Sequence, residues 1–120
     1  MRKIQVDELQ EIDGYIASAL VDMESGMLMA SHGGGDAIDL EVAAAGNSEV
    51  LKSKIKVSKS LKLNDSVEDI LITLFKHYHI IRPLETNNNV FLYLVLDKPK
   101  SNLALARHTL RAFEKTIDFS

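Results

Sequence analysis

Three glycines follow a histidine in residues 31–40, SHGGGDAIDL, and could serve a phosphate site, an esterase or a turn. A phosphate-binding loop of the Walker type needs a lysine and a hydroxyl residue directly after its last glycine. Here Asp36 follows Gly35, and an acidic side chain at the start of a helix would repel a phosphate. A nucleotide site is therefore not expected at these glycines.

The same stretch contains HGGG, which matches the oxyanion loop of some esterases. Such an enzyme also needs a Gly-x-Ser-x-Gly elbow, and the nearest segment, GNSEV at residues 46–50, lacks the second glycine and falls in a predicted helix. We therefore interpret the glycines as structural. They supply positive φ angles where the chain leaves a strand, and Asp36 is the predicted N-cap of the helix that follows.

Two histidines, His77 and His79, alternate so that both lie on one face of a predicted strand. A zinc site needs three or four ligands, and no further ligand is near in the sequence. A polar strand face is the favoured interpretation, and no metal or other cofactor is expected.

Lysines are concentrated in the second half of the predicted long helix, where Lys52, Lys56 and Lys59 share one face. Lysines near the negative C-terminal end of a helix are common on solvated faces. The alternative is an electrostatic patch for an acidic partner. Of the two, the sequence favours the solvated face.

Composition limits the class of protein. The chain has 120 residues, 46% of them hydrophobic and 26% charged, which predicts a single domain over residues 1–120. A net charge of −3 disfavours nucleic acid as a partner, and no apolar run is long enough to insert into a membrane. The absence of cysteine, with acidic residues where a signal peptide would be apolar, favours the cytoplasm.

Periodicity and turn residues predict five strands and three helices, an α+β sandwich of three layers. The final helix lies behind Pro99, with Ser101 or Asn102 as its cap. In chain order we expect a helix at 4–12, strands within 14–21 and 22–31, a long helix at 37–63, two strands within 67–85 divided by a turn near 76–78, a strand at 90–97 and a helix at 101–117.

The long helix is apolar on two sides, so one sheet does not cover both. Either the helix is sunk deeply into its own domain, or two copies pack their helices across a twofold axis, which we favour. The first apolar line holds Leu40, Ala44, Leu51 and Ile55, and the second holds Ala43, Gly46, Val50, Val57 and Leu61.

Two stretches, IDGYIASALVDMESGMLMAS at 12–31 and HIIRPLETNNNVFLYLVLDKPKSNLALARHTL at 79–110, resemble the Roadblock/dynein-light-chain family, in particular bacterial stand-alone Roadblock domains. The resemblance extends over about residues 12–113. It implies a profilin-like fold, in which a five-stranded antiparallel sheet has the long helix on one face and the two terminal helices on the other.

The resemblance also implies a homodimer, formed through the long helix and the middle edge strand so that one sheet continues across the pair. Carried over to this chain, the implied interface comprises Leu40, Ala43, Ala44, Asn47, Val50, Leu51 and Lys54 on the helix and Ile70, Ile72 and Leu74 on the strand.

The function that the resemblance implies is that of a non-enzymatic binding platform, which regulates or scaffolds a Ras-like small GTPase. The alternative from the residues is a small-ligand sensor, with His77, His79 or Arg82 in a cleft between sheet and helices. An enzyme is the third and least supported interpretation, because no catalytic constellation is present.

Overall fold

A computed structural model describes residues 4–119 of the chain. Its strands form one antiparallel sheet in the order β2-β1-β5-β4-β3. The elements in chain order are η1 (Asp7–Glu11), β1 (Tyr15–Asp22), β2 (Met27–Gly33), α1 (Leu40–Ser60), β3 (Ile70–Thr73), β4 (His77–Pro83), β5 (Val90–Asp97), η2 (Lys98–Lys100) and α2 (Leu103–Glu114).

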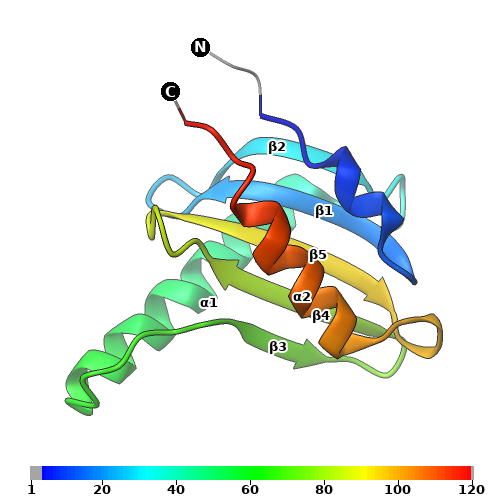
Figure 1. Cartoon of the computed structure of the whole chain (residues 1–120). Helices are drawn as coiled ribbons and strands as arrows, with labels where there is room; N and C mark the ends of the chain where they lie inside the picture. The colour runs from blue at the N-terminus through cyan, green and yellow to red at the C-terminus, as the bar shows by residue number, and fades with distance from the viewer. Residues whose placement is uncertain (1–3, 120) are drawn as a thin grey trace.

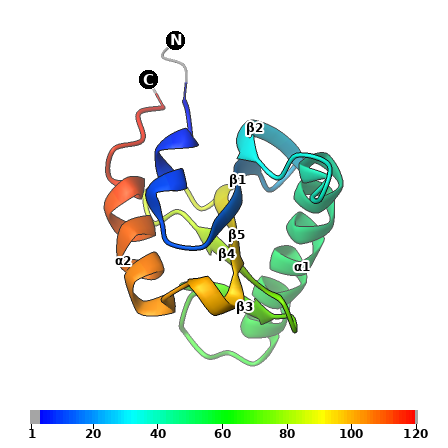
Figure 2. The same ribbon diagram turned by 90° about the vertical axis from the view of Figure 1, so that its right-hand side faces the viewer.

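Helices cover both faces of this sheet, α1 on one side and η1 with α2 on the other (Figures 1 and 2). The central strand β5 is consequently buried from Val90 to Leu96, which explains its continuous apolar sequence. Its side chains alternate between two cores, with Phe91, Tyr93 and Val95 facing α1 and Leu92, Leu94 and Leu96 facing α2. The predicted fold class is confirmed.

The boundaries of the helices differ from the prediction. α1 begins at Leu40 instead of residue 37, and its cap is Asp39, whose Oδ1 accepts hydrogen bonds from the amides of Glu41 and Val42. The predicted N-terminal helix is a single 3-10 segment, η1. Of the two candidate caps for α2, Asn102 is the one that accepts a hydrogen bond, from the Leu105 amide.

The glycines have the structural role that their sequence indicates. Gly33, Gly34 and Gly35 all have positive φ angles, from +50° to +82°. A Cβ at Gly33 would lie 2.5 Å from the carbonyl oxygen of Ile16, so only glycine fits between β2 and β1 there. The chain then turns, with Ile38 N–H donating to the Gly34 oxygen, before Asp39 starts the helix.

Candidate interaction face

The sheet ends at β3, a four-residue apolar strand that pairs with β4 on one side only. Ile70 and Ile72 point to the α1 side, where they are half-buried against the core beneath that helix. Leu74 follows the strand and is 44% exposed. The free side of β3 therefore offers backbone donors and acceptors beside apolar side chains.

α1 has an inner and an outer apolar line, as its sequence predicts. Ala44 and Leu51 are fully buried against the sheet of their own chain, so these two residues are not available for direct contact with a partner. The outer line carries Val50, Val57 and Leu61, which are 41%, 46% and 59% exposed. Residues 4–119 therefore leave this outer line largely uncovered, and the C-terminal end of α1 extends past the sheet (Figure 1).

The other predicted helix residues differ in their exposure. Leu40, Ala43 and Asn47 are half-buried, and Lys54 is exposed. Sequence reasoning missed Phe75, which is fully exposed in the turn between β3 and β4. The structure places this turn at residues 74–76 instead of near 76–78, so the predicted turn did not include Phe75. Once the turn is placed there, a solvent-exposed aromatic side chain is typical of an interface anchor.

We use the name apolar face for the outer line of α1, the residues of the β3 edge and Phe75. It consists of Val50, Val57, Leu61, Ile70, Ile72, Leu74 and Phe75.

The predicted histidine pair lies beside the apolar face, on the α1 side of β4. The rings of His77 and His79 stack with their centroids 5.7 Å apart, and His79 Nδ1 lies 3.0 Å from the Tyr93 hydroxyl. Burial lowers the pKa of His79, and the neighbouring His77 lowers it further. Burial also raises the pKa of Tyr93, against the effect of a hydrogen bond with Asn47.

The side chains of His77, His79 and Tyr93 can pack and hydrogen-bond, but they do not supply the ligands that a metal site needs. Among residues 4–119, no three His, Asp or Glu side chains come together as possible metal ligands. Ser48, the serine of the GNSEV segment, is buried and donates its hydroxyl to the Ala44 carbonyl within α1. It is therefore not placed as a nucleophile.

Arg82 lies on the opposite face of β4 from His77 and His79, because successive residues of a strand alternate. It is buried and paired with Glu114 of α2 at 3.0 Å. The structure therefore does not bring together the three residues of the predicted ligand cleft.

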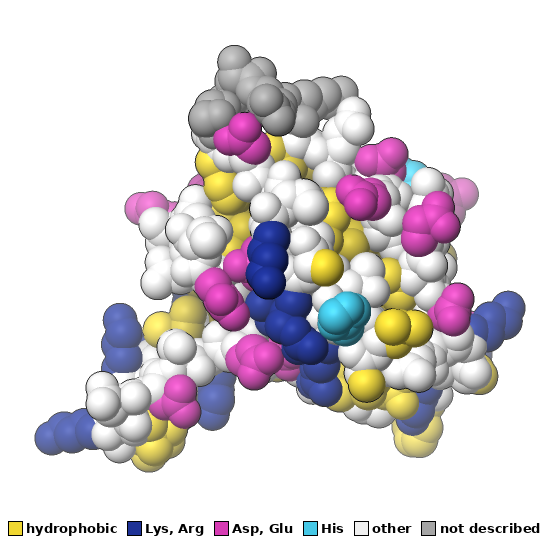
Figure 3. Space-filling model, viewed as in Figure 1, with side chains coloured by type: hydrophobic (Ala, Val, Ile, Leu, Met, Phe, Trp, Pro, Cys, Tyr) yellow, Lys and Arg dark blue, Asp and Glu magenta, His cyan; other side chains and the backbone are white. Residues whose placement is uncertain are grey.

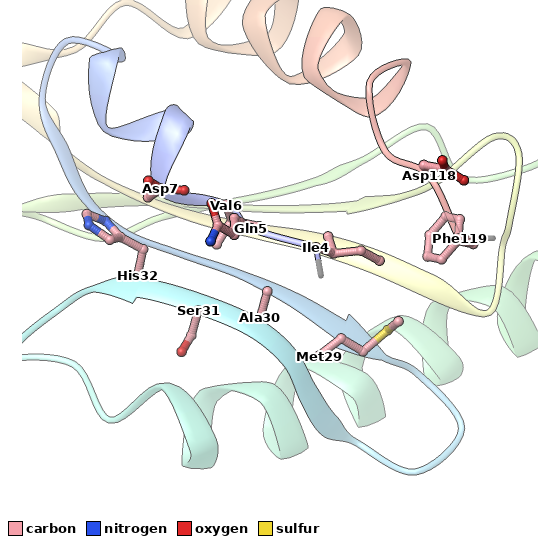
Figure 4. A pocket seen from close by; sticks show the side chains of 10 residues that line it. All are labelled: Ile4, Gln5, Val6, Asp7, Met29, Ala30, Ser31, His32, Asp118 and Phe119. Carbon is pink, nitrogen blue, oxygen red and sulfur yellow. The ribbon is translucent and has the colours of Figure 1, made fainter. Parts of the chain in front are cut away.

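A hollow of about 680 Å³ lies elsewhere, between residues 4–7, β2 and the segment after α2 (Figure 4). Apolar side chains such as Ile4, Met29 and Phe119 dominate its lining, with His32 at one end. The His32 Nδ1 atom is already engaged at 3.0 Å with the Tyr15 hydroxyl. None of His77, His79 and Arg82 lines this hollow.

In the described part of the chain, no helix has the length and hydropathy needed to cross a bilayer.

The sequence matches no protein-family model and no curated protein. Among solved structures, a Roadblock/LC7 domain from Streptomyces avermitilis has a TM-score of 0.78 at 13% identity, with 94% of each chain covered. Myxococcus xanthus MglB has a TM-score of 0.71 at 18% identity, over 95% of this chain and 88% of that one. The gliding protein MglB from Thermus thermophilus gives 0.68 at 15%, over 92% and 86%. These likenesses confirm the resemblance at the level of the fold.

Proposed function

We propose, from the Roadblock fold of this chain, that it acts as a non-enzymatic homodimer in the cytoplasm and regulates or scaffolds a Ras-like small GTPase. The observation that carries the proposal is the apolar face, which combines a free β3 edge with exposed apolar side chains on the outer line of α1. A second copy related by a twofold axis could pair β3 with β3 and cover Val50 and Val57. Such pairing would satisfy the free backbone groups of the edge strand.

A platform needs no catalytic side chains of its own, since the GTPase partner holds the nucleotide. The two motifs of this chain that could suggest catalysis, the glycines and the histidine pair, are consistent with that division of roles. The glycines around Gly34 are used for a turn, and His79 is hydrogen-bonded to Tyr93 within the fold. The small-ligand alternative has less support, because its three residues lie on opposite faces of the sheet.

The test is capture of partners with tagged full-length protein in the presence of GDP or of a non-hydrolysable GTP analogue. We expect one small GTPase to be enriched in one of the two nucleotide states, and the purified pair to bind directly. Its hydrolysis rate, measured with and without this protein, then distinguishes a regulator from a scaffold. Failure to recover a GTPase in either state would contradict the proposal.

A further inference from the structure

Charge is strongly segregated along this chain. Residues 50–64 contain five lysines and no acidic residue, whereas the remainder carries nine basic and 17 acidic residues. The lysine-rich segment is the C-terminal part of α1 and the turn after it, and its far end projects past the sheet. Dark-blue side chains mark this projection at the lower left of Figure 3. A basic arm therefore extends from an acidic body.

Three of these lysines surround a shallow hollow. Lys52, Lys56 and Lys59 lie on one face of α1, bordering a volume of about 470 Å³. Met23, from the turn after β1, and Ile55 of the helix contribute apolar surface to the same hollow. We call these five residues the basic groove.

Interactions within the chain explain only part of this arrangement. Lys52 donates to the Glu24 carbonyl at 3.2 Å and lies 3.6 Å from a Glu49 carboxylate oxygen. Lys56 and Lys59 make no ion pair with any residue in 4–119. The negative end of a helix stabilises cations only within its last turn, which accounts for Lys59 but not for Lys56.

We propose that the basic groove binds an acidic segment of a partner protein, with carboxylates on the lysines and one apolar side chain over Met23 and Ile55. The proposal is independent of the homodimer, because the groove lies on another side of α1 from Val50 and Val57. Charge complementarity supports it, since three cations surround a small apolar floor that a peptide can cover.

A membrane fits this geometry less well. An interfacial helix places its lysines along the flanks of the apolar stripe that enters the lipid. Here the exposed Val57 and Leu61 lie on the far side of the helix from Lys52 and Lys56, so one flat surface cannot contact both sets. A long nucleic acid would also meet the acidic remainder of the molecule.

The test uses fluorescence anisotropy of a short labelled peptide in which Glu and Asp surround one central Leu. The full chain is compared with the Lys52→Ala/Lys56→Ala/Lys59→Ala variant, and we expect at least tenfold weaker binding by that variant. Replacing Leu in the peptide by Ser should weaken binding about threefold, and raising the salt to about 0.15 M should also weaken it.

The matched control replaces three other exposed lysines, Lys76, Lys100 and Lys115, by alanine, for the same change in net charge. Its affinity should stay within about twofold of the parent chain. The double variant Lys56→Glu/Lys59→Glu, which retains the Lys52 contacts, should also lose binding. Equal loss in the control would overturn the proposal, as would tighter binding of phosphatidylserine vesicles or of single-stranded DNA than of the peptide.

Discussion

His79 contacts Tyr93 and His77, while one of its ring nitrogens has no partner in the part of the chain that the structure describes. Its Nδ1 atom lies 3.0 Å from the Tyr93 hydroxyl, and its ring stacks on His77. The Nε2 atom is buried and has no hydrogen-bond partner among residues 4–119. A second proton on this ring would place a charge in a desolvated site beside another histidine, so the neutral imidazole is favoured in the folded chain.

Stability should therefore depend on the protonation of His79. Its pKa is lowered by burial and by His77, whereas the unfolded chain retains the ordinary value of about 6.5. On acidification the unfolded state takes up the proton first, so the free energy of unfolding should fall as the pH drops through about 6.5 toward the folded pKa.

Urea unfolding between about pH 7.5 and 5 measures this dependence. His79→Gln, which retains a group able to hydrogen-bond Tyr93, should flatten the pH dependence. The matched control is His108→Gln, which removes an exposed histidine of α2 on the other side of the sheet from His79. An unaltered slope in the His79 variant would refute the assignment.

The apolar face predicts that Val50→Asp yields monomers. Val50 is 41% exposed in the single chain, so the variant should fold, but burial of an unpaired aspartate against a second copy should weaken association by at least a hundredfold, about 2.7 kcal/mol. Leu51→Asp is a poorer test, because Leu51 belongs to the core of its own chain. Analytical ultracentrifugation gives the mass, and circular dichroism confirms the fold.

The control for this variant is Ala104→Asp, the same chemical change at an exposed position of α2, on the other side of the sheet. It should leave the dissociation constant unchanged. If Val50→Asp and the parent chain have the same dimeric mass, the outer line of α1 is not the interface.

The glycines predict two very different responses to one added methyl group. Gly33→Ala would place a Cβ 2.5 Å from a backbone oxygen at a φ of +77°. Because the positive φ is strained and the backbone must move, the free energy of unfolding should fall by about 3 kcal/mol or more. A Cβ at Gly35 would meet no atom of residues 4–119 within 4 Å apart from its chain neighbours, so Gly35→Ala should cost only about 1 kcal/mol. Urea denaturation of both variants measures the difference, and equal losses would contradict the structural role assigned to Gly33.

Local chemistry explains which parts of the fold the sequence predicts well. The strands and α2 follow from turn residues and periodicity, except that the turn between β3 and β4 lies at residues 74–76 instead of near 76–78. Both apolar lines of α1 are visible in its spacing. The start of α1 was missed because Asp36 and Asp39 are both competent caps. The choice between them depends on the turn that Gly34 closes with Ile38, which sequence propensity does not specify.

The interface residues were harder to predict, because spacing shows two apolar sides of a helix without showing which side meets its own sheet. The structure places Ala44 and Leu51 inward and Val50 outward. Likewise, the sequence suggests Arg82 as a contact for a ligand, but its ion-pair partner Glu114 is 32 residues further along the chain. Contacts over that separation depend on the whole fold.

Removal of the Arg82–Glu114 ion pair should strongly lower the free energy of unfolding, although neither residue belongs to the apolar face. Their side chains are 4% and 5% exposed, and the second carboxylate oxygen of Glu114 accepts the Glu85 amide at 2.7 Å. Glu114→Ala would leave a buried guanidinium and an unpaired amide, so we expect a loss of about 3–5 kcal/mol in the free energy of unfolding. Glu68→Ala, which removes the exposed partner of Arg111, should cost less than about 1 kcal/mol. Urea denaturation of both variants measures the contrast, and similar small losses would show that water or Glu85 replaces the carboxylate.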